Sequence, residues 1–167
     1  TLNHPLIPTV LWADTAGEAA VMVEHRLVGD PLSSVWKSLT AVAKGKVLSD
    51  LIDFLGYLRT QKGERYYSVS TGRVYKSFLD QLTDSAKEKL EIIEKHESAR
   101  SLAAHIKEIL YSADREKLFQ ADGGIIIVHG DLIIHNLLSD GKQLTGVLDW
   151  ELGMFGNPNF DLFRLWY

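Results

Sequence analysis

The feature that most constrains this chain is the stretch VHGDLIIHNLL at residues 128–138, in which polar residues stand between two apolar runs. The stretch IIIVH at residues 125–129 predicts a buried strand, and a second apolar run begins after Asn136. Asp131 and Asn136 therefore lie five residues apart in a loop between two strands. We predict that this loop presents polar side chains at one end of a small sheet.

A hairpin is predicted directly after the loop, over residues 136–150, because the pair Asp140-Gly141 lies between apolar stretches. Asn136 and Asp149 occupy the outer ends of its strands, so antiparallel pairing brings them to the same end. Their oxygens suit Mg²⁺, which takes one or two protein carboxylates together with substrate phosphates and water. Asp131 is then free to accept a proton from an attacking hydroxyl.

Each of these residues also has a structural interpretation, and both interpretations stay open. Asp131 could satisfy backbone N–H groups, Asn136 could be a turn residue, and Asp149 could cap a helix or turn. His129, at the end of an apolar strand, is more typical of a hydrogen-bonded core histidine than of a catalyst. A further alternative is a zinc-dependent hydrolase with His129, Asp131 and His135 as ligands. The remaining histidines form no matching cluster.

The order of predicted elements, strands followed by helices and then a small hairpin, indicates an α+β fold. Strands are expected over residues 7–13 and 19–27, where β-branched and apolar residues flank the turn sequence DTAGE. Apolar residues at three- to four-residue spacing predict helices within 33–60 and 83–111. Residues 156–162 are expected to be a loop that enters a further helix.

Local signals predict where these helices start and what lies between them. Ser33 and Ser34 are expected to cap the first helix, and Ser85 with Glu88 has the spacing of a capping box. Residues 61–77 are polar, with glycine and aromatic residues, and are expected to form an ordered surface loop.

The charge balance limits the partners of the chain. It has 18 basic and 22 acidic residues among 167, without a block of like charge. Nucleic acid is therefore not expected as a partner, since phosphate backbones need a basic stripe. Cysteines are absent, which excludes disulfides and thiolate metal sites. Neither a signal peptide nor an apolar run of roughly 18 residues is found. We expect a cytoplasmic protein that does not cross a membrane.

The motifs HGDLIIHN, LTGVLDWE and GNPNFDL, in this order, resemble the phosphotransferases of the aminoglycoside and choline kinase type. This family shares the protein-kinase fold. The earlier stretch AAVMVEHRLVGDPLSSVW is similar to the family's linker between the lobes. The resemblance implies mainly the helical C-terminal lobe with its small catalytic hairpin, together with remnant strands of the N-terminal lobe and the hinge.

By this resemblance Asp131 is the catalytic base, while Asn136 and Asp149 hold Mg²⁺ against the phosphates of ATP or GTP. His129 and Asp161 match residues that support the catalytic loop. The expected partners are thus a nucleotide and a small molecule with a hydroxyl group. The resemblance also implies which residues bind the nucleotide. The hinge contributes Val23, Glu24, His25 and Arg26, and the surface beneath the adenine, called the floor here, contributes Leu138 and Leu148.

The resemblance divides the chain into residues 1–27, remnant N-terminal-lobe strands with the hinge, and residues 28–167, the C-terminal lobe. Within the latter, 125–151 holds the catalytic loop and metal-binding hairpin. No stretch matches the family's glycine-rich loop or lysine–glutamate pair, or its C-terminal helices. We expect a truncated ATP-dependent O-phosphotransferase. The alternative is a module without catalytic activity that binds a nucleotide or a partner. We also consider self-association through an exposed lobe interface.

Overall fold

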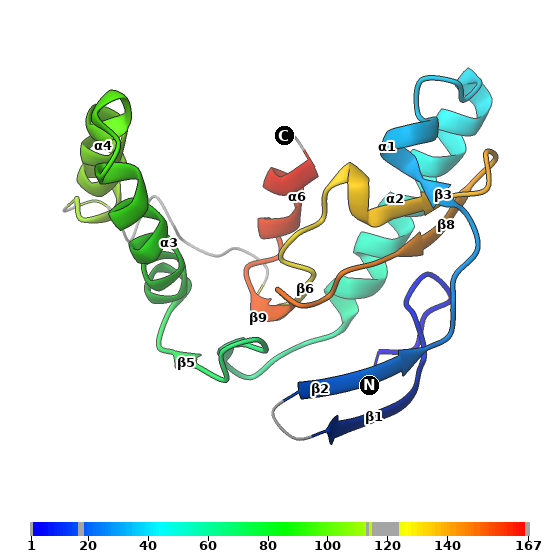
Figure 1. Cartoon of the computed structure of the whole chain (residues 1–167), viewed down its shortest axis with the longest axis horizontal. Coiled ribbons are helices and arrows are strands. Elements are labelled where there is room, and N and C mark those ends of the chain that lie inside the picture. The colour runs from blue at the N-terminus through cyan, green and yellow to red at the C-terminus, as the bar shows by residue number, and fades with distance from the viewer. Residues whose placement is uncertain (1, 17–18, 113, 115–123, 166–167) are drawn as a thin grey trace.

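The computed structural model describes residues 2–16, 19–112, 114 and 124–165, which form a mixture of helices and small sheets (Figure 1). The strands are β1 (Val10–Ala16), β2 (Ala19–Glu24), β3 (Asp30–Pro31), β4 (Tyr66–Ser68), β5 (Val74–Tyr75), β6 (Ile126–Val128), β7 (Leu137–Ser139), β8 (Leu144–Val147) and β9 (Met154–Gly156). The helices are α1 (Leu32–Val35), α2 (Ala41–Thr60), α3 (Phe78–Glu94), α4 (Arg100–Leu110) and α6 (Phe160–Leu165), with short 3-10 helices at Glu97–Ala99 and Ile134–Asn136. In this part of the chain no helix has the length and apolar character to cross a membrane. The predicted α+β class is confirmed.

The strands form three separate sheets. β1 and β2 pair antiparallel as a two-stranded ribbon, which confirms the two strands predicted near the N-terminus. A three-stranded sheet has the order β3-β7-β8, and a four-stranded sheet has the order β5-β4-β9-β6. The predicted hairpin is β7–β8, in which Leu137 faces Val147. Its turn contains Gly141, whose φ of 87° suits a residue without a side chain.

The main core lies between α2 and the β7–β8 hairpin. Val47 and Phe54 of α2, Leu132 of the loop after β6 and Val147 of β8 are fully buried in it. Burial of one such side chain stabilises the fold by about 1.5–3 kcal/mol relative to exposure. Among the described residues, this core contains Leu32, Leu39, Ala43, Val47, Leu51, Phe54, Leu58, Leu132, Leu137, Leu144 and Val147. The loop after β6 and the hairpin are therefore anchored on one rigid helix.

The segment before β1 also contacts this core. The N–H of Val147 donates to the carbonyl oxygen of Leu6 at 2.7 Å, and the rings of His4 and Phe54 lie 5.1 Å apart between centroids. Residues 2–7 thus pack against the larger part of the chain. The domain boundary after residue 27 stays a prediction.

Helices α3 and α4 pack against each other and form a helical arm, residues 78–110, which stands apart from the main core (Figure 1). The arm has a small core of its own, made of Leu90, Ala103 and Leu110. At its base Gln81 is buried and its Nε2 donates to the carbonyl oxygen of Phe155 in β9 at 3.3 Å. The arm is therefore joined to the rest of the molecule mainly at one end.

The predicted cap of the first helix is wrong. α1 begins at Leu32 after Pro31, without a side-chain cap. The hydroxyl of Ser34 instead donates to the carbonyl oxygen of Pro31 at 2.7 Å. Proline sets φ near the helical value, so it can start the helix one residue before the serines.

The predicted capping box of the second helix is also wrong. α3 begins at Phe78, and its cap is Ser77, whose Oγ accepts a hydrogen bond from the N–H of Asp80 at 3.1 Å. Ser85 lies inside the helix, and the side chain of Glu88 is outside the described part of the structure. Ser77 and Asp80 have the same spacing as Ser85 and Glu88, so the local pattern alone did not decide between them.

The predicted surface loop at 61–77 contains the short strands β4 and β5. β4 pairs with β9, so that Tyr67 faces Phe155 across the sheet. β4 and β5 pair as a hairpin, which is also linked to α3. Arg73 Nη1 and the hydroxyl of Tyr75 donate to Asp84 Oδ2 at 2.7 and 2.8 Å. Strands of two or three residues are too short for a period-two pattern to be recognised.

Candidate active site

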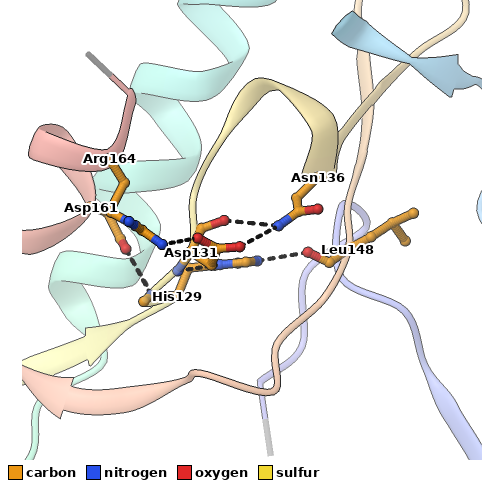
Figure 2. Close-up of polar contacts among 7 residues, drawn as sticks. His129, Asp131, Asn136, Leu148, Asp161 and Arg164 are labelled. Atoms are coloured by element: carbon orange, nitrogen blue, oxygen red, sulfur yellow. Dashed lines mark hydrogen bonds and ion pairs between the residues drawn. The ribbon is translucent and has the colours of Figure 1, made fainter. Parts of the chain in front are cut away.

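Asp161, in the first turn of α6, holds the loop that follows β6. The N–H groups of His129 and Gly130 donate to its two carboxylate oxygens at 2.8 and 2.9 Å (Figure 2). Asp161 is buried, and this burial raises the pKa of its carboxyl, while the two hydrogen bonds act in the opposite direction. The backbone of the loop is thereby pinned to α6.

Gly130 occupies a position that no other residue fits. Its φ is 84°, in the left-handed region. A Cβ at this position would overlap the carbonyl oxygen of Leu152 and lie 2.8 Å from its carbonyl carbon. The glycine of the His-Gly-Asp triplet therefore permits the close approach of two backbone segments.

The ring of His129 is fully buried and both of its nitrogens are used. Nδ1 accepts from the N–H of Asp131 at 3.2 Å, and Nε2 lies 2.8 Å from the carbonyl oxygen of Leu148. A backbone N–H can only donate and a carbonyl can only accept, so the ring is neutral with its proton on Nε2. Burial lowers the pKa of His129 accordingly. No ring nitrogen is left for zinc, which disfavours the hydrolase alternative.

The carboxylate of Asp131 is contacted at both oxygens (Figure 2). Oδ2 accepts from Nδ2 of Asn136 at 3.2 Å, and Oδ1 accepts from Nη2 of Arg164. The same Nδ2 also donates to the backbone oxygen of Asp131 at 2.9 Å. The amide nitrogen of Asn136 thus faces Asp131, and its oxygen points away (Figure 2).

Strand pairing brings Asp149 next to Asn136. The N–H of Leu148 donates to the backbone oxygen of Asn136 at 2.8 Å, and Asp149 is the next residue. Asp149 is exposed, and its φ of 67° is unusual for a residue other than glycine. Such backbone positions cluster at functional sites. An amide oxygen and a carboxylate are thus presented at the same end of the hairpin.

These two oxygen donors fit Mg²⁺ better than a metal that needs an all-protein cage. Mg²⁺ is usually bound by one or two carboxylates together with phosphates and water. Within the part of the chain that the structure describes, no group of three or more histidine, aspartate or glutamate residues could hold a metal. A metal bound by Asn136 and Asp149 would need ligand oxygens to complete its coordination.

The residues predicted to bind the nucleotide come from two segments that meet. Leu27, at the end of the predicted hinge, packs over Gly146 together with Leu138 of β7. A Cβ on Gly146 would lie 2.8 Å from Cδ1 of Leu27 and 3.1 Å from Cδ1 of Leu138. Leu138 is buried and Leu148 is half-buried, whereas Val23, Glu24, His25 and Arg26 are exposed. The N–H of His25 donates a hydrogen bond to the carbonyl oxygen of Thr9 at 2.8 Å. The segment predicted to be the hinge therefore contacts the β7–β8 hairpin through Leu27.

Arg164 is the site residue that the sequence analysis missed. It lies three residues after Asp161, so the two side chains project from the same face of α6. A signal was present in the sequence, since a basic residue follows the predicted supporting acid by one helical turn. Only the packing of α6 shows that it reaches Asp131.

Comparison with known proteins gives a consistent result. The chain matches the model of the phosphotransferase enzyme family over residues 3–167, whereas no curated protein sequence matches it significantly. Aminoglycoside phosphotransferase APH(4)-Ia has a similar structure, with a TM-score of 0.67 at 18% identity over 96% of this chain and 55% of that one. The gentamicin complex of APH(2")-IIa is also similar, with a TM-score of 0.62 at 22% identity over 93% and 50% of the two chains.

A thermostable mutant of APH(4)-Ia in ternary complex with ADP and hygromycin B has a TM-score of 0.64 at 18% identity. The similarity covers 98% of this chain and 56% of that one. The chain thus spans about half the length of these solved structures. The predicted protein-kinase-like fold is confirmed.

Proposed function

The chain belongs to the phosphotransferase enzyme family, and from this membership we propose that it transfers the terminal phosphate of ATP or GTP to a hydroxyl group of a small molecule. Asp131 orients that hydroxyl and accepts its proton, and Asn136 and Asp149 hold Mg²⁺. The observation that carries the proposal is the double contact of Asn136 Nδ2 with the backbone and side chain of Asp131, at 2.9 and 3.2 Å. It links the base to a metal ligand in one rigid unit.

The chemistry that this unit supports is positioning rather than covalent catalysis. The side chain of Asp131 is 19% exposed, so an acceptor hydroxyl can reach a carboxylate that the protein otherwise encloses. When bound, Mg²⁺ neutralises charge on the phosphates. Asn136 offers its amide oxygen and Asp149 its exposed carboxylate to that ion. The neutral ring of His129 keeps the backbone of Asp131 in place without adding a competing charge.

The nucleotide is proposed to lie against the hinge, with Leu138 and Leu148 beneath its base. Solved neighbours of the chain contain ADP with hygromycin B, or ATP with streptomycin. These neighbours support a nucleotide as phosphate donor and a small molecule as acceptor. Aminoglycosides are therefore the first acceptors to test.

Self-association and a cytoplasmic location stay predictions. Self-association is supported by the ribbon of β1 and β2, which exposes large apolar side chains. These are Val10, Leu11, Trp12, Val21, Met22 and Val23.

The proposal is tested by calorimetric titration of the chain with ATP, with and without Mg²⁺. We expect magnesium-dependent binding that is weakened at least about tenfold in Asp149→Ala, since even outer partners of metal sites matter this much. Asp131→Ala should keep its affinity for Mg²⁺-ATP, while transfer to water, gentamicin, streptomycin or hygromycin B falls about 10²–10⁴-fold. Glu108→Ala, on the exposed face of α4, is the control for removal of a carboxylate.

Three results would separate the alternatives. Equal Mg²⁺-ATP affinity in the wild type and in Asp149→Ala would contradict the metal assignment. Loss of nucleotide binding in Asp131→Ala would contradict the role of base. Binding without transfer by the wild type would support the alternative of a nucleotide-binding module without turnover.

A further inference from the structure

We propose that Arg164 is a positioning residue for the catalytic base, an inference that rests on the proposed function of Asp131. The guanidinium group donates from Nη2 to Oδ1 of Asp131 (Figure 2). Asn136 donates to the other oxygen, Oδ2, at 3.2 Å. The carboxylate is thus held from two sides, by α6 and by the short helix that precedes β7.

Contacts at both oxygens fix the rotation of the carboxylate plane. The terminal torsion of an aspartate is otherwise broad, so an unheld carboxylate samples many directions. Each carboxylate oxygen has two acceptor sites, and one contact on each leaves a site free for the acceptor hydroxyl. Asp131 therefore keeps its capacity to accept a proton while its direction is set in advance. Such preorganisation lowers the barrier because the base is already aligned when the substrate binds.

One turn of α6 holds three consecutive residues of the loop. Asp161 accepts from the N–H groups of His129 and Gly130 at 2.8 and 2.9 Å. Arg164, one turn later on the same helix face, binds the side chain of Asp131. An anion thus holds the backbone of the loop, and a cation holds its reactive group. The position of α6 consequently determines where the base lies relative to the end of β6.

The ion pair is a poor source of stability, which points to a different role. The side chains of Arg164 and Asp131 are 40% and 19% exposed, and pairs in such surroundings stabilise a fold little. The Nε of Arg164 is buried, and none of the described residues accepts a hydrogen bond from it. A buried donor without a partner is unfavourable. What the pair does set is the direction of the carboxylate.

The test is steady-state kinetics of the chain with Mg²⁺-ATP and water, gentamicin, streptomycin or hygromycin B as acceptor. Arg164→Met should lower kcat about 10- to 100-fold, the loss expected for a misplaced catalytic group, with KM for ATP within about twofold of the wild type. Arg164→Lys should recover part of the loss, because it restores the charge without the planar fork. The matched control is Arg73→Met, which removes an exposed guanidinium that binds Asp84 at 2.7 Å, and it should leave kcat unchanged.

The outcomes separate this inference from the proposed function. A wild-type chain that transfers no phosphate would overturn both. An active wild type with the same kcat as Arg164→Met would overturn the inference alone, as would equal losses in the Lys and Met variants or a loss confined to KM for ATP. If Arg164→Met does not fold, Arg164→Gln takes its place, and the difference between the Gln and Lys variants decides in the same way.

Discussion

The main core and the helical arm are both built on helices, but the main core has the larger cluster of buried residues. In the main core α2 packs against a β-hairpin, and Val47 and Phe54 are fully buried. In the arm α3 and α4 have mainly each other to pack against, and the buried cluster between them consists of Leu90, Ala103 and Leu110. The arm is therefore expected to be the less stable of the two regions, because less burial opposes its conformational entropy.

The proposed active site belongs to the strongly buried region. Asp131 and Asn136 alternate along the loop with residues that are almost fully buried, namely His129, Leu132 and Leu137. A displacement of the loop would expose these apolar groups or break the hydrogen bonds of the imidazole. Precise placement of the polar groups thus depends on burial of their neighbours. In the part of the chain that is described, none of the residues proposed to act in catalysis lies in the arm, so its polar side chains do not need such precise placement.

Two leucine-to-alanine variants give the largest expected contrast. Leu58 of α2 is 1% exposed and Leu90 of α3 is 3% exposed, so they are matched in type and burial. Leu58→Ala should lower the free energy of unfolding by about 2–5 kcal/mol and weaken Mg²⁺-ATP binding. Leu90→Ala should melt the arm at lower urea while the nucleotide affinity stays within about twofold, since its core is separate. Urea titration and calorimetry measure these effects, and equal losses of affinity would break the comparison.

Two glycine-to-alanine variants sharpen the contrast between a crowded and an open position. Gly130 and Gly72 both have positive φ, at 84° and 69°. A Cβ on Gly130 would overlap the backbone of Leu152, whereas a Cβ on Gly72 would meet nothing within 4 Å. We expect Gly130→Ala to reduce the free energy of unfolding by roughly 2–4 kcal/mol and Gly72→Ala by roughly 1 kcal/mol. A Gly130→Ala variant as stable as Gly72→Ala would show that the loop can move freely.

The smallest expected effect is a pH dependence of stability that comes from His129. Burial lowers its pKa below the ordinary value of 6.5, so below that pH the unfolded chain binds a proton that the folded chain does not. Stability should therefore fall as the pH decreases through the ordinary histidine range, by at most about 1.4 kcal/mol per pH unit from this group.

His129→Gln removes this contribution, so its stability should be lower at neutral pH and should vary less with pH. Urea titrations at several pH values measure both slopes. His4, whose pKa burial also lowers, contributes to both proteins and cancels in the comparison. Identical slopes would mean that folding does not change the pKa of His129, which contradicts the effect of burial.

The parts of the fold that the sequence predicted depend on local signals. Asp140-Gly141 specifies a tight turn between apolar stretches, and the β7–β8 hairpin forms there. The periodic apolar residues of α2 likewise predicted the face that is buried. The start of α1 was missed because a proline beside the serines also favours a helix start. The start of α3 was missed because the sequence offers two capping patterns of equal spacing, one at Ser77 and one at Ser85. β4 and β9 were missed because short strands gain their structure from distant partners.

The sequence by itself determined which chemical groups are available and in what order: Asp131, Asn136, Asp149 and Asp161, together with family membership through their spacing. Tertiary structure decided which of them meet. Arg164 reaches Asp131 from 33 residues away, and the tautomer of His129 follows from a carbonyl 19 residues further along. Turn and helix preferences act between near neighbours, so they can be read from a linear pattern. Ion pairs and buried hydrogen bonds depend on how distant elements pack, and on the exclusion of water that this packing produces.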